Sequence, residues 1–202
     1  MREKLFKLHK SKVFEIFCAL TLAMSVLVML YSFRIGGWTN NTFSALGRAN
    51  PLWFNVFVVT LTLAIISNLW FFSRKIEYNG KSLYFLLPAM MFSAVTICLF
   101  NHEYILWIRN VHNLFSVKLM ICSGVLLAIM LAYRHQRKIP YIAFMLLTAI
   151  ISISSMFIVG LLVLNQVSIF ISIMLVVFVV NYIDPPRIAT KNQPHFTKST
   201  EI

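Results

Sequence analysis

Acidic side chains are scarce in this sequence of 202 residues. Six Asp and Glu stand against 18 Lys and Arg, and Asp184 is the only aspartate. Glu15 lies near the start of the first long apolar run, and no acid lies in the middle of any such run. Carboxylates inside a membrane-spanning helix mark proton relays and ion paths. Their absence argues against proton-coupled transport.

Cysteine is also rare, and no recognised catalytic motif is present. Cys18, Cys98 and Cys122 are far apart in the sequence, and no two lie at a matched depth for a disulfide. Each is expected to be a small buried apolar residue. Broken helices in corresponding positions of two halves, a mark of many transporters, are missing. The sequence therefore says more about architecture than about activity.

Apolar residues are abundant: they make up 59% of the chain, the mean hydropathy is +0.80 and only 12% of residues are charged. A soluble domain of this size could not bury so much apolar surface. About 20 apolar residues form a helix that crosses roughly 30 Å of hydrocarbon. Such runs are 13–31, 52–72, 83–100, 114–133 and, as two spans, 140–183.

The run 140–183 is too long for one helix, and a turn is predicted at 164–167, where Asn165 and Gln166 interrupt it. Because backbone groups in lipid must be paired within the protein, the spans should be helices. The sequence predicts an all-α, polytopic membrane protein with a six-transmembrane-helix bundle at 13–183. A basic segment precedes it at 1–12, and a disordered tail with three prolines follows at 184–202.

Basic residues alternate between the gaps. Fourteen of the 18 lie in the first segment, the second-to-third gap, the fourth-to-fifth gap and the tail. The other four are Arg34, Arg48, Arg109 and Lys118. Since Lys and Arg stay on the cytoplasmic side, both termini are predicted to be cytoplasmic, in a bacterial plasma membrane. The net charge of +12 then predicts contact with anionic lipid headgroups at that face rather than with nucleic acid.

Two separate segments place polar residues at the same predicted depth, near the outer ends of the second and fourth helices. This outer cluster consists of Ser44, Arg48, Asn55, His112, Ser116 and Lys118. A lysine one turn inside the membrane needs a partner, water or a route to the interface. One interpretation is a shallow pocket for a lipid headgroup or a small anionic ligand. The other is hydrogen bonding between helices, with a lysine that reaches the interface.

The outer face also offers candidate metal ligands. His102, Glu103 and His112 supply ligand types that bind zinc. The two histidines are ten residues apart, which is not a recognised spacing of metal ligands. An interfacial loop whose polar residues face water accounts for the same three residues. No cofactor is therefore expected.

Three short stretches resemble a known family. They are 43–47 (FSALG), 50–55 (NPLWFN) and 111–116 (VHNLFS). They resemble the prokaryotic membrane family called domain of unknown function 998 and, in layout, the Frag1/DRAM/Sfk1 family. The resemblance implies a six-helix bundle whose outward polar cluster includes Ser44, Gly47, Asn55 and His112. It implies a lipid-related role and no established reaction.

The sequence leaves three classes of function open. A non-enzymatic membrane protein that binds lipid, alone, as a homo-oligomer or with a membrane-protein partner, agrees best with the pattern. A small transporter or permease component is the alternative. A metal-dependent membrane lipid hydrolase fits less well, because Ala45 follows Ser44 where the family motif has an aspartate, and Asp184 lies on the wrong side.

Overall fold

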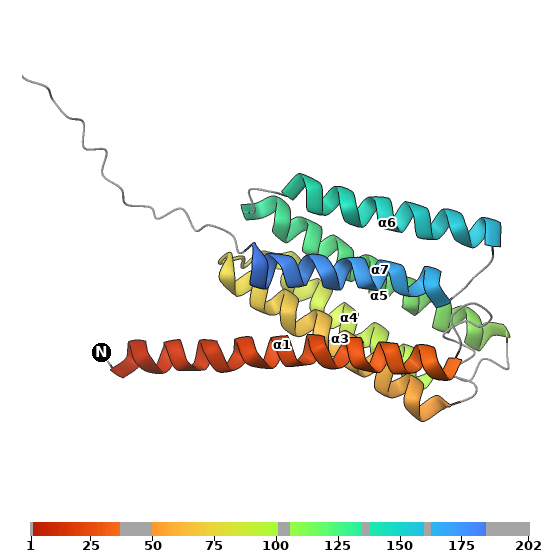
Figure 1. Ribbon diagram of the computed structural model, residues 1–202, viewed down its shortest axis with the longest axis horizontal. Coiled ribbons are helices and arrows are strands. Elements are labelled where there is room, and N and C mark those ends of the chain that lie inside the picture. Colours follow the sequence, from red (N-terminus) through yellow and green to blue (C-terminus); the bar gives the residue numbers. More distant parts are fainter. Residues whose placement is uncertain (1, 37–49, 101–105, 135–137, 160–162, 185–202) are drawn as a thin grey trace, which may run out of the picture.

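The computed structural model describes residues 2–36, 50–100, 106–134, 138–159 and 163–184. Within these ranges the chain forms six α-helices, one π-helical turn and no strand. The elements are α1 (Arg2–Gly36), α3 (Pro51–Lys75), α4 (Lys81–Leu99), α5 (Leu106–Arg134), α6 (Lys138–Val159), α7 (Val163–Phe178) and η1 (Val179–Ile183). The helices lie roughly side by side in a bundle (Figure 1).

Helix α3 is the central element of the bundle. Two thirds of its apolar window are buried, and it packs against α1, α4, α5 and α7. Its start is fixed by Asn50, whose side chain accepts a hydrogen bond from the Trp53 backbone N–H at 3.1 Å, followed by Pro51 at the first helical position. One stripe of α3, with Val56, Val59 and Leu63, stays exposed, while residues on its other faces contribute to the core.

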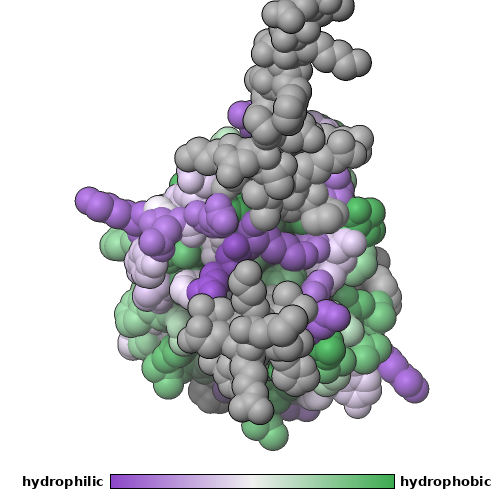
Figure 2. All heavy atoms as spheres, turned by 90° about the vertical axis from the view of Figure 1, so that its left-hand side faces the viewer, coloured by the Kyte–Doolittle hydropathy of each residue, from purple (hydrophilic) through white to green (hydrophobic). Residues whose placement is uncertain are grey.

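The start of α1 and the end of η1 lie at the same end of the bundle, called here the termini end (Figure 1). Figure 2 views this end and shows hydrophilic residues gathered at its middle with apolar side chains around them. Exposed cations there include Arg74, Lys81 and Lys138. Along the flanks, by contrast, large apolar side chains such as Leu20, Phe85 and Ile150 are 59%, 75% and 61% exposed. A surface of this kind is stable in lipid and not in water.

Five helices are long and apolar enough to cross a membrane: Lys12–Ser32, Pro51–Lys75, Lys81–Leu99, Asn110–Tyr133 and Lys138–Ser155. They match the first five predicted spans closely. The sixth span is α7 continued by η1, of which Ser168–Ile183 is counted as a shorter apolar helix. The predicted six-helix bundle is confirmed.

The predicted turn at 164–167 is wrong. Helix α6 ends at Val159 and α7 begins at Val163, so Asn165 and Gln166 lie in the first turns of α7. Gly160 directly follows Val159 in the sequence, and glycine is the residue that most often follows the last turn of a helix. The glycine is therefore a better boundary signal here than the two amides.

Candidate functional site

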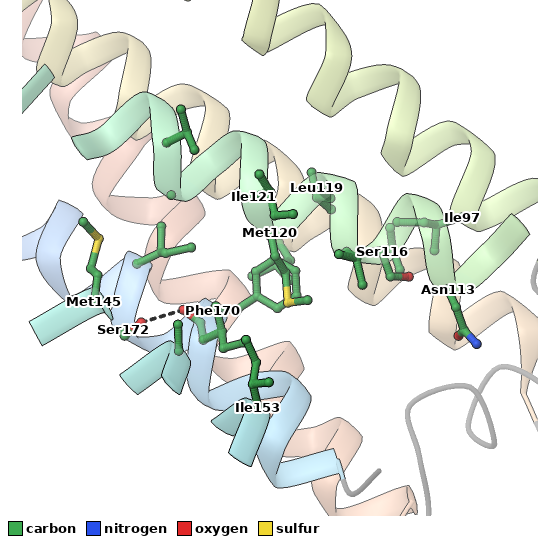
Figure 3. A pocket seen from close by; sticks show the side chains of 18 of the residues that line it. Ile97, Asn113, Ser116, Leu119, Met120, Ile121, Met145, Ile153, Phe170 and Ser172 are labelled. Carbon is green, nitrogen blue, oxygen red and sulfur yellow. Dashed lines mark hydrogen bonds between the residues drawn. The ribbon is translucent and has the colours of Figure 1, made fainter. Parts of the chain in front are cut away.

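A cavity of about 580 Å³ lies among α3, α5, α6 and α7, toward the end of the bundle opposite the termini. Figure 3 shows Asn113 and Ser116 of α5 at one end of it and Met145 of α6 toward the other. Met120 and Phe170 lie between them. Most of the lining is aliphatic or aromatic, and none of the described lining residues is charged. The volume falls in the range of small-molecule sites.

The cavity exists because α6 packs on α7 and stands away from α5. Among the described α6 side chains only Met145 and Ser152 are buried, and the Ser152 hydroxyl is hydrogen-bonded to that of Ser168 on α7. Where α6 faces α5, the facing residues include Gly124, Ala128 and Ala149. Small residues on two facing helices leave space that larger side chains would fill.

The cavity opens sideways between α5 and α6. On α5, the lining residues Val117, Ile121 and Val125 are 46%, 58% and 45% exposed. On α6, Leu146 and Ile153 are 58% and 50% exposed. Side chains that line a closed cavity would be buried. This site is therefore a groove that meets the hydrocarbon of the bilayer along its length.

The mouth of the groove is polar but carries no described charge. His112 is 4% exposed, and its ring lies 5.6 Å from that of Phe54 on α3. The Ser116 hydroxyl donates to the His112 carbonyl at 2.9 Å, while Asn113 is exposed at the rim. Histidine and asparagine both donate and accept hydrogen bonds. The mouth can therefore hold a polar group that sits above an apolar body.

The structure brings only part of the predicted outer cluster to this groove. His112 and Ser116 line it, whereas Lys118 does not. The Lys118 ammonium lies 5.6 Å from the ring centroid of Phe92 on α4 and 5.1 Å from that of Phe115, which are cation–π distances. Lys118 therefore packs along the α4 side of α5, away from the groove.

The other predicted site residues lie beside the groove or outside the described residues. Asn55 follows Phe54 in α3, is partly buried and does not line the groove. Four residues fall outside the described ranges: Ser44, Arg48, His102 and Glu103. Their roles in ligand or metal binding stay predictions.

A second polar cluster, absent from the sequence-based prediction, lies toward the termini end. Its centre is Asn68, which is fully buried in α3. The Asn68 side-chain N–H groups donate to the carbonyls of Cys18 and Ala64, both at 2.9 Å. Its Oδ1 accepts from the Tyr182 hydroxyl at 3.2 Å, and its carbonyl accepts from Asn181 Nδ2 at 3.1 Å. Asn68 thus ties α3 to both α1 and η1.

Lys75 closes the same cluster at the membrane surface. Its ammonium donates to the Asn181 carbonyl, lies 4.0 Å from Glu15 Oε1 and sits 4.4 Å from the Phe71 ring centroid. Carbonyls at the end of a helix lack helical donors, so a lysine is a suitable partner for one. Nearby, the Tyr141 hydroxyl of α6 donates to Asp184 at 2.8 Å. These contacts hold the π-helical turn in place.

One signal in the sequence could have located this cluster. Asn68 and Asn181 are amides inside otherwise apolar spans, and polar groups in lipid pair with one another. The groove had a weaker signal, because Gly124, Ala128 and Ala149 have meaning only once α5 and α6 are known to face each other.

Fold and site together define an integral membrane protein: a helical bundle with a lipid-facing groove and a buried polar cluster near its termini. No family model, no curated protein and no solved structure matches the chain. The resemblance to the domain of unknown function 998 and to the Frag1/DRAM/Sfk1 family stays a proposal.

Proposed function

We propose that this protein is a non-enzymatic, lipid-binding protein of a bacterial plasma membrane. A lipid would lie in the groove between α5 and α6, with its chain along the apolar wall and its headgroup near His112 and Asn113. The sideways opening of the groove carries the proposal, because both of its long rims expose apolar side chains.

The chemistry of the lining favours a lipid over a water-soluble ligand. A sugar, nucleotide or amino acid would need polar partners along its whole length, since buried polar groups without partners are costly. The described lining offers polar side chains mainly at the mouth and in Ser172, whose hydroxyl already donates to the Ile169 carbonyl at 2.7 Å (Figure 3). An amphiphile with one polar end matches this distribution.

A bulky side chain in the groove should displace the lipid. Ala149 lines the groove, so Ala149→Phe should lower the bound lipid by about tenfold, or roughly 1.4 kcal/mol. Native mass spectrometry of protein extracted with a mild detergent measures lipid per protein. Lipid identity follows from fragmentation of the released species.

Ala143→Phe is the matched control, because Ala143 lies on the same helix and is exposed outside the groove. It should leave lipid content at the wild-type level. If both variants keep the same lipid content as wild type, the groove does not hold the lipid and the proposal fails.

The orientation of the bundle is also part of the proposal. The basic gaps favour a cytoplasmic termini end, with the groove mouth facing outward. Anionic lipid headgroups are then the expected partners of the cations at the termini end.

Impermeant thiol labelling tests this orientation. In a background without native cysteines, Asn110→Cys should react from outside intact cells and Asn79→Cys should not, and both positions are exposed. Permeabilised cells should label both, which controls for reactivity. Labelling of the Asn79 position in intact cells would reverse the orientation.

A further inference from the structure

The groove is longer than half the thickness of a membrane. Its lining on α5 extends from His112 at the mouth to Ala128. At 1.5 Å per residue this distance along the helix axis is about 24 Å. The hydrocarbon of one leaflet is roughly 15 Å, half of the usual core. A chain that fills the groove from its mouth therefore crosses the midplane.

Helix α6 supports the same depth independently. Helix α6 runs from Lys138 to Val159, so its middle lies near Thr148, and the lining continues to Ile142, about 9 Å farther toward the termini end. On α5, the middle of Asn110–Tyr133 lies near Ile121, and Ala128 is about 10 Å beyond it. Two antiparallel helices thus place the inner end of the groove in the second leaflet.

The inner end offers nothing to a second headgroup. The lining residues past the midplane are Gly124, Val125, Ala128, Ile142, Met145 and Leu146. Their side chains are apolar or absent, whereas His112, Asn113 and Ser116 lie at the mouth. A single amphiphile with its polar end at the mouth fits this asymmetry better than two lipids placed end to end.

From this geometry we infer that the groove takes one lipid whose hydrocarbon chain is longer than a leaflet, as in polyisoprenyl lipids. This inference rests on the proposed lipid-binding function and specifies its ligand class. A hydrocarbon chain has apolar surroundings both in the groove and among the lipid tails of a bilayer, so the hydrophobic effect does not favour either place. Selectivity for one chain therefore comes from packing contacts. Only a long chain makes those contacts beyond the midplane.

A pair of isoprenyl lipids with the same headgroup tests the inference. Farnesyl monophosphate and a long-chain polyprenyl monophosphate are titrated separately into wild-type protein in lipid nanodiscs, and bound lipid is counted by native mass spectrometry. The long chain should bind about fivefold more tightly, or roughly 1 kcal/mol, with one lipid per protein.

A variant at the inner end should remove this preference. Ala128→Phe shortens the groove past the midplane, so it should weaken polyprenyl binding about fivefold and leave farnesyl binding unchanged. Ala132→Phe, one turn farther along α5 at an exposed position outside the groove, is the control and should preserve the preference.

A photoreactive group at the end of the polyprenyl chain gives a measurement on the wild-type protein. It should crosslink to α5 and α6 near Ala128 and Ile142. Equal affinity for both lipids, two farnesyl lipids per protein, or crosslinks confined to the mouth would each overturn the long-chain inference while lipid binding itself stands. Failure of the wild-type protein to bind either lipid would instead count against the proposed function.

Discussion

Replacing Asn68 with aspartate should destabilise the bundle far more than the same replacement at an exposed asparagine. The Asn68 amide nitrogen donates hydrogen bonds to the carbonyls of Cys18 and Ala64. In aspartate an oxygen takes its place, so that acceptor would face acceptor. At a fully buried position the charge has no water to stabilise it. We expect a loss of roughly 3 kcal/mol, because buried unmatched polar groups cost this much even when they are neutral.

Thermal unfolding in detergent measures this loss as a fall in Tm of about 10 °C. The control is Asn79→Asp, which changes the same atom at an exposed position. Asn79 Oδ1 accepts a hydrogen bond from the Tyr84 hydroxyl, and a carboxylate preserves that contact. A Tm for Asn68→Asp within about 2 °C of wild type would show that the Asn68 contacts do not stabilise the fold.

Lys75→Glu should produce the next largest loss. It replaces the donor to the Asn181 carbonyl and turns the contact with Glu15 from attraction into repulsion. The ion pair contributes little, because the two side chains are 25% and 43% exposed and solvent screens them. The unpaired carbonyl contributes more, and together the two effects cost about 2 kcal/mol.

The expected consequence is faster amide hydrogen exchange in η1, with a Tm lower by about 5 °C. Arg74→Glu is the matched control, since Arg74 is the exposed neighbour of Lys75. The double variant Lys75→Glu, Glu15→Lys restores the ion pair but leaves the Asn181 carbonyl without its lysine donor. It should therefore recover only a minor part of the fall in Tm. Full recovery by the double variant would mean that the ion pair, and not the carbonyl contact, holds η1.

The spans were predictable because each helix that crosses a membrane needs its own apolar run of sufficient length. This requirement can be checked segment by segment, without knowledge of the neighbouring helices. The predicted run 52–72 lies inside α3, and 114–133 lies inside α5. The predicted boundary between α6 and α7 is wrong because Asn165 and Gln166 are helical, whereas Gly160 directly follows the end of α6. In a helix that packs in a bundle, polar side chains can remain helical if neighbouring helices contact them.

The candidate site was less predictable, because it depends on which faces meet. Sequence placed His112 and Lys118 at one depth, but depth alone does not show direction around the helix axis. The structure turns His112 toward Phe54 and Lys118 toward Phe92. Likewise, Asn68 and Asn181 are 113 residues apart, so only the fold brings them together.

The pairing of α6 with α7 has a mechanical consequence. The two helices are fastened near one end by Ser152 and Ser168, and the chain after α7 is fastened to the other end of α6 through Tyr141 and Asp184. Two attachment points fix both the spacing and the rotation of a pair. Helix α7 is itself packed in the core, and η1 is tied to α3 through Asn68 and Lys75, so α6 is held at a set distance from α5. The space between α5 and α6 is therefore preformed and needs no movement of the bundle to open.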